Sequence, residues 1–251
     1  MKRSSRTTLS AAALLAALAS QLAHAGPADY VATPNVEYGE KEIDFKYGIA
    51  TQKDGQKNRE ASIGYGYGVG ENWFTEVYLH YTRDPGMATR LETVEWENKF
   101  QLAEPGEYPV DAGLLVEFEY PNSPSAPREL KISALLQKDI AKVQLNGNLY
   151  LERNIGGTQN ADEPHQTEFG YQWQAKYRWL PQFEYGLQGF GETGKWNEWD
   201  PASLQQHSAG PAVFGKFAVG SHHLKYNAAW LTGRTSATAS HTLRTQVEYE
   251  F

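Results

Sequence analysis

The chain has 251 residues, with 23 Lys and Arg against 30 Asp and Glu, and it has no cysteine. The formal charge of −7 argues against a nucleic-acid-binding protein, which needs a basic face. The absence of cysteine excludes disulfides and thiolate chemistry. No apolar run after residue 25 reaches the roughly 20 residues of a transmembrane helix.

The first 25 residues have the pattern of a secretory signal peptide. Basic residues open the chain, an Ala- and Leu-rich stretch covers residues 9–22, and an A-x-A motif ends at Ala25; the basic residues are Lys2, Arg3 and Arg6. A membrane anchor would need a longer apolar stretch. We expect cleavage after Ala25, which leaves 20 basic against 30 acidic residues and a charge of −10.

Residues 26–35 contain Pro27 and Pro34 and show no periodicity, so we expect a short periplasmic lead-in there. From residue 36 to residue 251 apolar and polar side chains alternate, which predicts β-strands with one face in each environment. Turn residues divide the alternation into twelve expected strands: 43–49, 61–69, 73–82, 94–102, 110–120, 130–137, 143–152, 168–179, 183–192, 208–217, 224–230 and 243–251.

One expected strand carries glycines on a single face, at Gly64, Gly66 and Gly68. A row of glycines leaves room for long side chains from neighbouring strands, and it also helps a sheet to curve. The same run does not fit a nucleotide-binding loop, because no helix follows it and the spacing is wrong.

The connections alternate between short turns and longer loops, and the number of strands is even. Aromatic residues lie at both ends of the apolar faces, as in the interfacial girdles of membrane barrels: Trp73, Trp179, Phe183, Phe217 and Phe251 at one end, and Tyr81, Tyr120, Phe169 and Trp230 at the other. A soluble sandwich would need loops that cross between sheets. We therefore predict an all-β fold, a transmembrane up-and-down antiparallel β-barrel of about twelve strands.

The last strand ends in Tyr249-Glu250-Phe251. It resembles the C-terminal strand of Gram-negative outer-membrane β-barrels, which ends in Phe with Tyr two residues earlier. The resemblance implies an outer-membrane location, lipid as a partner, and recognition of Tyr249 and Phe251 by the barrel assembly machinery. The runs at residues 94–100 and 135–139 look like those of small uncharacterised barrels. More loosely, the chain is similar to the barrel family linked to meta-pathway phenol degradation, presumed transporters.

The expected inner face is rich in acids, and simple hairpin register pairs Glu76 with Glu97 and Glu95 with Glu117. The candidate lumen residues are Glu76, His80, Glu95, Glu97, Lys99, Asp111, Glu117, Glu119, Lys131, Lys176 and Arg178. One interpretation is a cation-attracting constriction, with basic residues on the opposite wall. The other is a plug, in which the charges pair to fill a narrow barrel.

Trp196 and Trp199 in an expected outer loop are candidates for contact with a ligand, or for packing on the loop's own neighbours. His207 and Ser208 are adjacent, so their side chains diverge on a strand, which argues against a catalytic pair. His222 and His223 diverge in the same way, and we expect neither a metal site nor a cofactor.

The sequence thus predicts a narrow, passive pore for small solutes with a partly acidic lumen. The alternatives are a closed structural or adhesive barrel that acts through its outer loops, and an outer-membrane lipid-modifying enzyme.

Overall fold

The computed structural model describes residues 26–156 and 166–251, so the predicted signal peptide and most of the loop after residue 156 lie outside the described residues. The described part is all β, and it contains no helix long and apolar enough to cross a membrane. The strands are β1 (Lys41–Thr51), β2 (Lys57–Gly70), β3 (Trp73–Arg83), β4 (Arg90–Gln101), β5 (Asp111–Pro121), β6 (Arg128–Ile140), β7 (Val143–Ile155), β8 (Thr167–Leu180), β9 (Phe183–Lys195), β10 (Glu198–Trp199), β11 (Gln206–Val219), β12 (His222–Gly233) and β13 (His241–Glu250).

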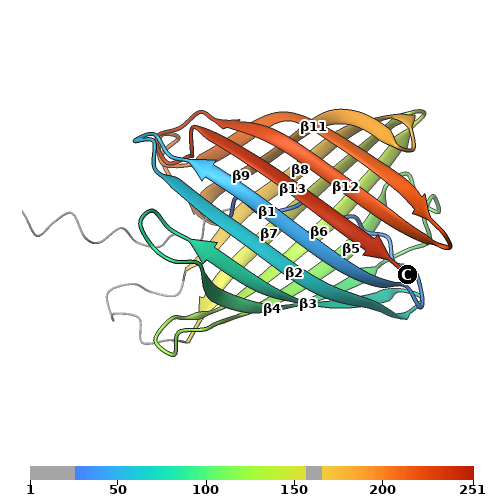
Figure 1. Ribbon diagram of the computed structural model, residues 1–251, viewed down its shortest axis with the longest axis horizontal. Helices are drawn as coiled ribbons and strands as arrows, with labels where there is room; N and C mark the ends of the chain where they lie inside the picture. The colour runs from blue at the N-terminus through green and yellow to red at the C-terminus, as the bar shows by residue number, and fades with distance from the viewer. Residues whose placement is uncertain (1–25, 157–165) are drawn as a thin grey trace, which may run out of the picture.

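Twelve of these strands form one closed antiparallel barrel, in which every long strand pairs with its neighbour along the chain. The ring closes where the red β13 lies beside the blue β1 in Figure 1, with Phe45 opposite Val247. At that seam the backbone N–H of Phe251 donates to the carbonyl of Lys41 at 2.8 Å. β10 is a two-residue extension paired with β9. The predicted up-and-down barrel of about twelve strands is confirmed.

Alternation sorts the side chains of each strand between the outside and the lumen. In β1 the buried side chains include those of Glu42, Asp44 and Lys46, whereas Ile43 and Phe45 are exposed on the outside. An acidic side chain that is 1% exposed, next to a phenylalanine that is 45% exposed, is the reverse of a soluble core. An apolar exterior of this kind faces lipid. The closed barrel is suited to lipid because it leaves no backbone N–H or C=O without a hydrogen bond.

The barrel has two unlike ends. At the short-turn end the connections at residues 71–72, 141–142, 181–182 and 220–221 are tight, and the chain terminates there. Aromatic pairs crowd this end: Trp73 stacks on Phe100, Trp179 packs edge-on against Phe183, and Phe217 stacks on Tyr226. The other end, with loops at 84–89, 122–127 and 200–205, is called the long-loop end. The connection at residues 102–110 is a long exception at the short-turn end.

Residues 26–40, named the strap, run lengthwise through the lumen before β1 begins. Gly26 lies against Glu60 in the long-loop half, and the N–H of Gly39 bonds to the carbonyl of Gly68 at the short-turn end. Ala28, Ala32 and Pro34 of the strap are buried. We expected residues 26–35 to be a short periplasmic lead-in. Their small and apolar side chains instead fill space that twelve strands leave open.

Candidate functional site

The strap is held between two apolar patches on the polar inner wall. On one side Ala32 and Tyr30 pack against Leu115 of β5 and Leu135 of β6. On the other side Val31 packs against a cluster from β9, β11 and β12, which comprises Phe190, Ala212, Phe214, Ala229 and Leu231. Successive strap residues therefore face opposite walls. Leu115 and Leu135 both break the alternation of their strands, and such apolar residues on the polar face are the sequence signal that something apolar lies in the lumen.

Glycines on the wall make room for the strap. A Cβ on Gly48 would overlap the carbonyl oxygen of Pro27, and a Cβ on Gly68 would overlap that of Glu37. The glycine row leaves room for a long side chain from the neighbouring strand, as predicted, because a Cβ on Gly64 would overlap the ring of Tyr78. These glycines are needed for close approach rather than for an unusual backbone conformation.

Polar contacts fix the strap along its length. The Tyr30 hydroxyl donates to Oε2 of Glu97 at 2.6 Å, and the backbone N–H of Val36 donates to Oε1 of Gln101 at 2.8 Å. In the amide orientation that satisfies both of its ends, Asn148 accepts from the N–H of Ala32 at 2.9 Å and donates to its carbonyl at 3.1 Å. Wall and strap are therefore joined by directional bonds as well as by apolar contact.

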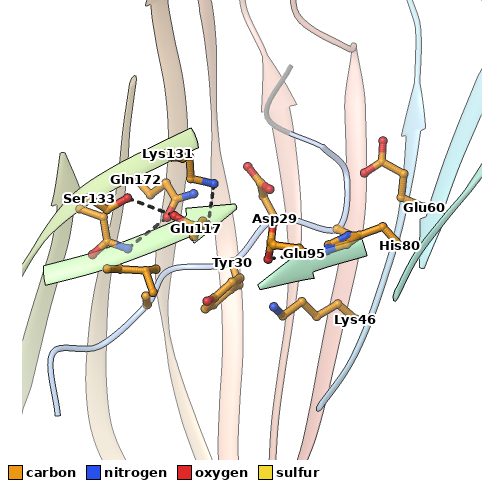
Figure 2. A pocket seen from close by; sticks show the side chains of 14 residues that line it. Asp29, Tyr30, Lys46, Glu60, His80, Glu95, Glu117, Lys131, Ser133 and Gln172 are labelled. Atoms are coloured by element: carbon orange, nitrogen blue, oxygen red, sulfur yellow. Dashed lines mark hydrogen bonds and ion pairs between the residues drawn. The ribbon is translucent and has the colours of Figure 1, made fainter. Parts of the chain in front are cut away.

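Beside Tyr30, three buried carboxylates of the wall converge. Oxygen atoms of Glu95, Glu97 and Glu117 lie within 4.8 Å of one another. Lys131 pairs with Glu117 at 2.9 Å, and His80 lies 3.6 Å from Glu95. Figure 2 shows Tyr30 lying between Glu117 and Lys131 on one wall and Lys46 on the other. Because each carboxylate has a hydrogen-bonding or cationic partner in the chain, the trio forms a polar network that surrounds the strap.

The strand register confirms one predicted pair and corrects another. Glu76 is opposite Glu97, as expected. Glu97, however, is opposite Glu117, and Glu95 is opposite Glu119 rather than Glu117. The shift of two residues arises because the nine-residue connection at 102–110 is not a simple hairpin turn.

Asp111 does not extend the acidic patch. Its Oδ1 accepts a hydrogen bond of 2.6 Å from the N–H of Gly106, so it stabilises the turn before β5. Lys99 is placed in the lumen, where its Nζ lies 4.9 Å from the ring centre of Phe74.

The predicted basic wall is largely neutralised by acids close to it. Lys176 pairs with Glu184 at 3.1 Å. Arg178 pairs with Asp139 at 3.0 Å, and both side chains are about two-fifths exposed, which places this pair at the rim rather than deep in the lumen. Local ion pairs of this kind weaken the expected field across the barrel.

At the short-turn rim, Glu40, Glu248 and Glu250 also converge. Lys225 bonds to Glu248 at 2.7 Å and to Glu250. Burial, followed by the hydrogen bond to Glu250, raises the pKa of Glu40 to about 7. Glu40 can therefore share its proton with Glu250, which relieves repulsion within the group.

The strap divides the lumen into two cavities. The larger, about 730 Å³, opens at the short-turn end and is lined by strap residues together with Glu42, Glu76 and Lys176. The smaller, about 280 Å³, lies at the long-loop end and is lined by Gly26, Glu60 and Arg244 among others. Between them, beside Asp29 and Tyr30, a pocket of only about 40 Å³ has room for on the order of three water molecules.

The loop tryptophans are placed outside the lumen. Trp199 stacks on Phe169 of β8, with ring centres 6.2 Å apart. This contact agrees with packing on neighbouring residues rather than with a ligand contact. Trp196 is 57% exposed, and its backbone N–H bonds to the carbonyl of Thr167. Tyr249 and Phe251 stack at 5.8 Å on the outer surface at the short-turn end.

The histidines named from the sequence have separate partners. His207 lies 2.9 Å from the Tyr171 hydroxyl through Nδ1 and 2.9 Å from Gln205 through Nε2. His222 contacts the terminal aromatic pair, whereas His223 lies 3.8 Å from Glu250. The separate partners of His222 and His223 agree with the predicted divergence of adjacent side chains on a strand.

No protein-family model matches the chain, and no curated protein matches its sequence. Among solved structures, an outer membrane channel from Pseudomonas putida F1 aligns over 90% of this chain and 99% of its own, with 13% identity and a TM-score of 0.57. The translocator domain of the autotransporter NalP from Neisseria meningitidis aligns over 86% and 89%, with 11% identity and a TM-score of 0.49. The outer membrane protein Omp33 from Acinetobacter baumannii aligns over 86% and 100%, with 9% identity and a TM-score of 0.45.

The fold is that of the Gram-negative outer-membrane β-barrels. The apolar exterior and aromatic rims agree with this fold, and the protein belongs in the outer membrane. At this level of identity the likeness establishes architecture only. The expected similarity to the meta-pathway phenol-degradation barrels is not shown by these comparisons.

Proposed function

We propose that the protein is a narrow outer-membrane channel for small polar solutes, constricted by its own strap. The observation that carries the proposal is the pair of cavities, about 730 Å³ and 280 Å³, that approach each other from the two ends of the barrel. Only the strap and the network around Tyr30 separate them. A barrel closed for purely structural reasons has no need of wide, polar, water-accessible vestibules on both sides of a constriction.

A preference for cations or neutral solutes follows from the charges at the constriction. Glu76, Glu95, Glu97 and Glu117 are all buried around it, against His80, Lys46 and Lys131. A confined acidic excess raises the local concentration of cations and repels anions. The large cavity also contains more acids than bases in its lining, which supports the same preference.

Conductance in planar bilayers tests the proposal directly. The wild-type barrel should give small, discrete openings, and a variant that lacks residues 26–34 behind the intact leader should give openings several times larger. Heat-modifiable migration on a gel should first establish that the deletion variant is a folded barrel. Silence of the wild type at all voltages would reject a pore, and equal conductance of both folded barrels would reject the strap as the constriction.

A cross-linked strap offers a second route if the deletion variant fails to assemble. The chain has no cysteine, so an Ala32→Cys, Leu135→Cys pair places the only thiols of the protein at a packed contact between strap and wall. Oxidation should suppress any fluctuation to larger openings, and reduction should restore it. The single variant Leu135→Cys controls for the loss of the leucine.

A further inference from the structure

Glu60 is a lumen acid that lies beside the first described residue of the strap, Gly26. It lies on the inner face of β2, with Gly48 of β1 opposite it, and its side chain reaches the long-loop cavity. Within residues 26–156 and 166–251 no Lys, Arg or His forms an ion pair with it. Its carboxylate accepts a backbone hydrogen bond from Ala28, and a second acid, Asp29, is close by. His80 attracts the Glu60 carboxylate from a distance but lies against Glu95, so no positively charged group among the described residues is in contact with Glu60.

The strap brings its first described residue to this carboxylate. A Cβ on Gly26 would overlap Oε2 of Glu60, so the backbone of Gly26 itself lies against the carboxylate. Gly48 of β1 is opposite Glu60 of β2 on one side and Arg244 of β13 on the other. Because Gly48 has no side chain, it leaves a gap into which the Pro27 carbonyl fits. The close approach is therefore built by two glycines, one on the strap and one on the wall.

The predicted processing changes the chemistry at this point. Hydrolysis of the Ala25–Gly26 peptide bond by a signal peptidase adds the elements of water: the released leader ends in a carboxylate, and Gly26 keeps the nitrogen as a primary amine. An α-amine has an ordinary pKa of roughly 7.7–8.0 and so takes up a proton at neutral pH. A neutral amide with one donor becomes an ammonium with three, next to the Glu60 carboxylate.

We propose that Glu60 forms an ammonium-binding site in the lumen, and that its occupant is the chain's own N-terminal amine after removal of residues 1–25. The mature strap is then fixed at both ends, by the covalent bond into β1 and by an ion pair in the long-loop half. Glycine at the first mature position leaves the Glu60 carboxylate in place, whereas a side chain there would displace it. This inference rests on the predicted cleavage and holds whether or not the barrel conducts.

Carbamylation of the N-terminal amine by cyanate tests the site, because cyanate is small and reacts only with the unprotonated amine. The mature protein is purified from outer membranes in detergent, its first residue is established by intact mass, and the labelled N-terminal peptide is quantified over time at pH 7.5. The wild-type amine should react roughly sevenfold more slowly than that of Glu60→Gln, since a rise of about one unit above an ordinary amine pKa of roughly 7.7–8.0 lowers the unprotonated fraction at pH 7.5 by about that factor. Glu42→Gln, which removes a buried lumen acid at the opposite end of β1, should react like the wild type.

Equal rates in the wild type and Glu60→Gln would overturn the proposal, and so would a mature chain that begins elsewhere than Gly26. Glu60→Asp retains the charge but withdraws it by one methylene, so its rate should lie between the other two. If Glu60→Gln does not assemble, the carbamylation rate of the folded wild-type amine is compared with that of the same protein in denaturant. A folded amine that reacts as fast as the denatured one would then reject the ion pair.

Discussion

The hydroxyl of Tyr30 donates a hydrogen bond of 2.6 Å to Oε2 of Glu97, 67 residues away, and this bond joins the strap to the wall at the narrowest part of the lumen. Tyr30 also packs on the Leu115 and Leu135 patch. A single residue therefore couples apolar docking of the strap to the acidic network.

Tyr30→Phe should loosen the strap while leaving the barrel intact. A hydrogen bond to a charged group contributes about 1.5–3 kcal/mol, so its loss should raise the population of displaced strap roughly tenfold or more. Single-channel recording should show larger openings more often. Tyr38→Phe, in an exposed part of the same strap, is the matched control and should behave like the wild type. Indistinguishable recordings for Tyr30→Phe would mean that this bond does not hold the strap.

Gly48→Val should displace the strap from β1, because its Cβ would overlap the Pro27 carbonyl, which is backbone and cannot rotate away. We expect conductance to rise several-fold, with heat-modifiable folding retained. The matched control is Gly147→Val, which replaces a strand glycine by the same residue. The added Cβ would have no neighbour within 4 Å, so this variant should leave conductance unchanged. Similar conductance in the two variants would argue that the strap does not narrow the pore.

The double variant Glu95→Gln, Glu97→Gln should lower the cation-to-anion permeability ratio by roughly twofold or more, since it removes two charges in a low-dielectric constriction. Reversal potentials in a salt gradient measure this ratio. Glu198→Gln removes a charge from the exposed β10 and should have no effect. An unchanged ratio in the double variant would place selectivity elsewhere in the lumen.

Deletion of Phe251 should reduce the amount of folded barrel in the outer membrane several-fold. Phe251 stacks on Tyr249 and its N–H bonds to Lys41 at the seam, and the resemblance to outer-membrane barrels implies that the assembly machinery reads this end. Phe217→Ala removes another rim aromatic at the short-turn end and should cost less. Quantitative immunoblotting of outer-membrane fractions measures both, and equal levels would mean that the terminal motif is incidental.

Much of the architecture could be predicted from the sequence because it depends on local pattern. Alternation at period two decides which side chains of a strand share a face, whatever the rest of the chain does. The run from Ile43 to Ile49 and the terminal Tyr249-Glu250-Phe251 therefore predicted exposed apolar faces and a closing strand. The pairing of Glu76 with Glu97 followed from a short turn with a fixed register.

The tertiary structure alone decided what fills the lumen. Residues 26–35 have no period, so nothing local indicated that they enter the barrel. Their position depends on apolar wall residues such as Leu115, Leu135 and Phe190, which come from distant strands and face one space only once the ring has closed. The same closure decided the partner of Glu95, because a nine-residue connection does not determine register, and it brought Gly26 to Glu60. Sequence periodicity acts over neighbouring residues, whereas a lumen is made by all twelve strands together.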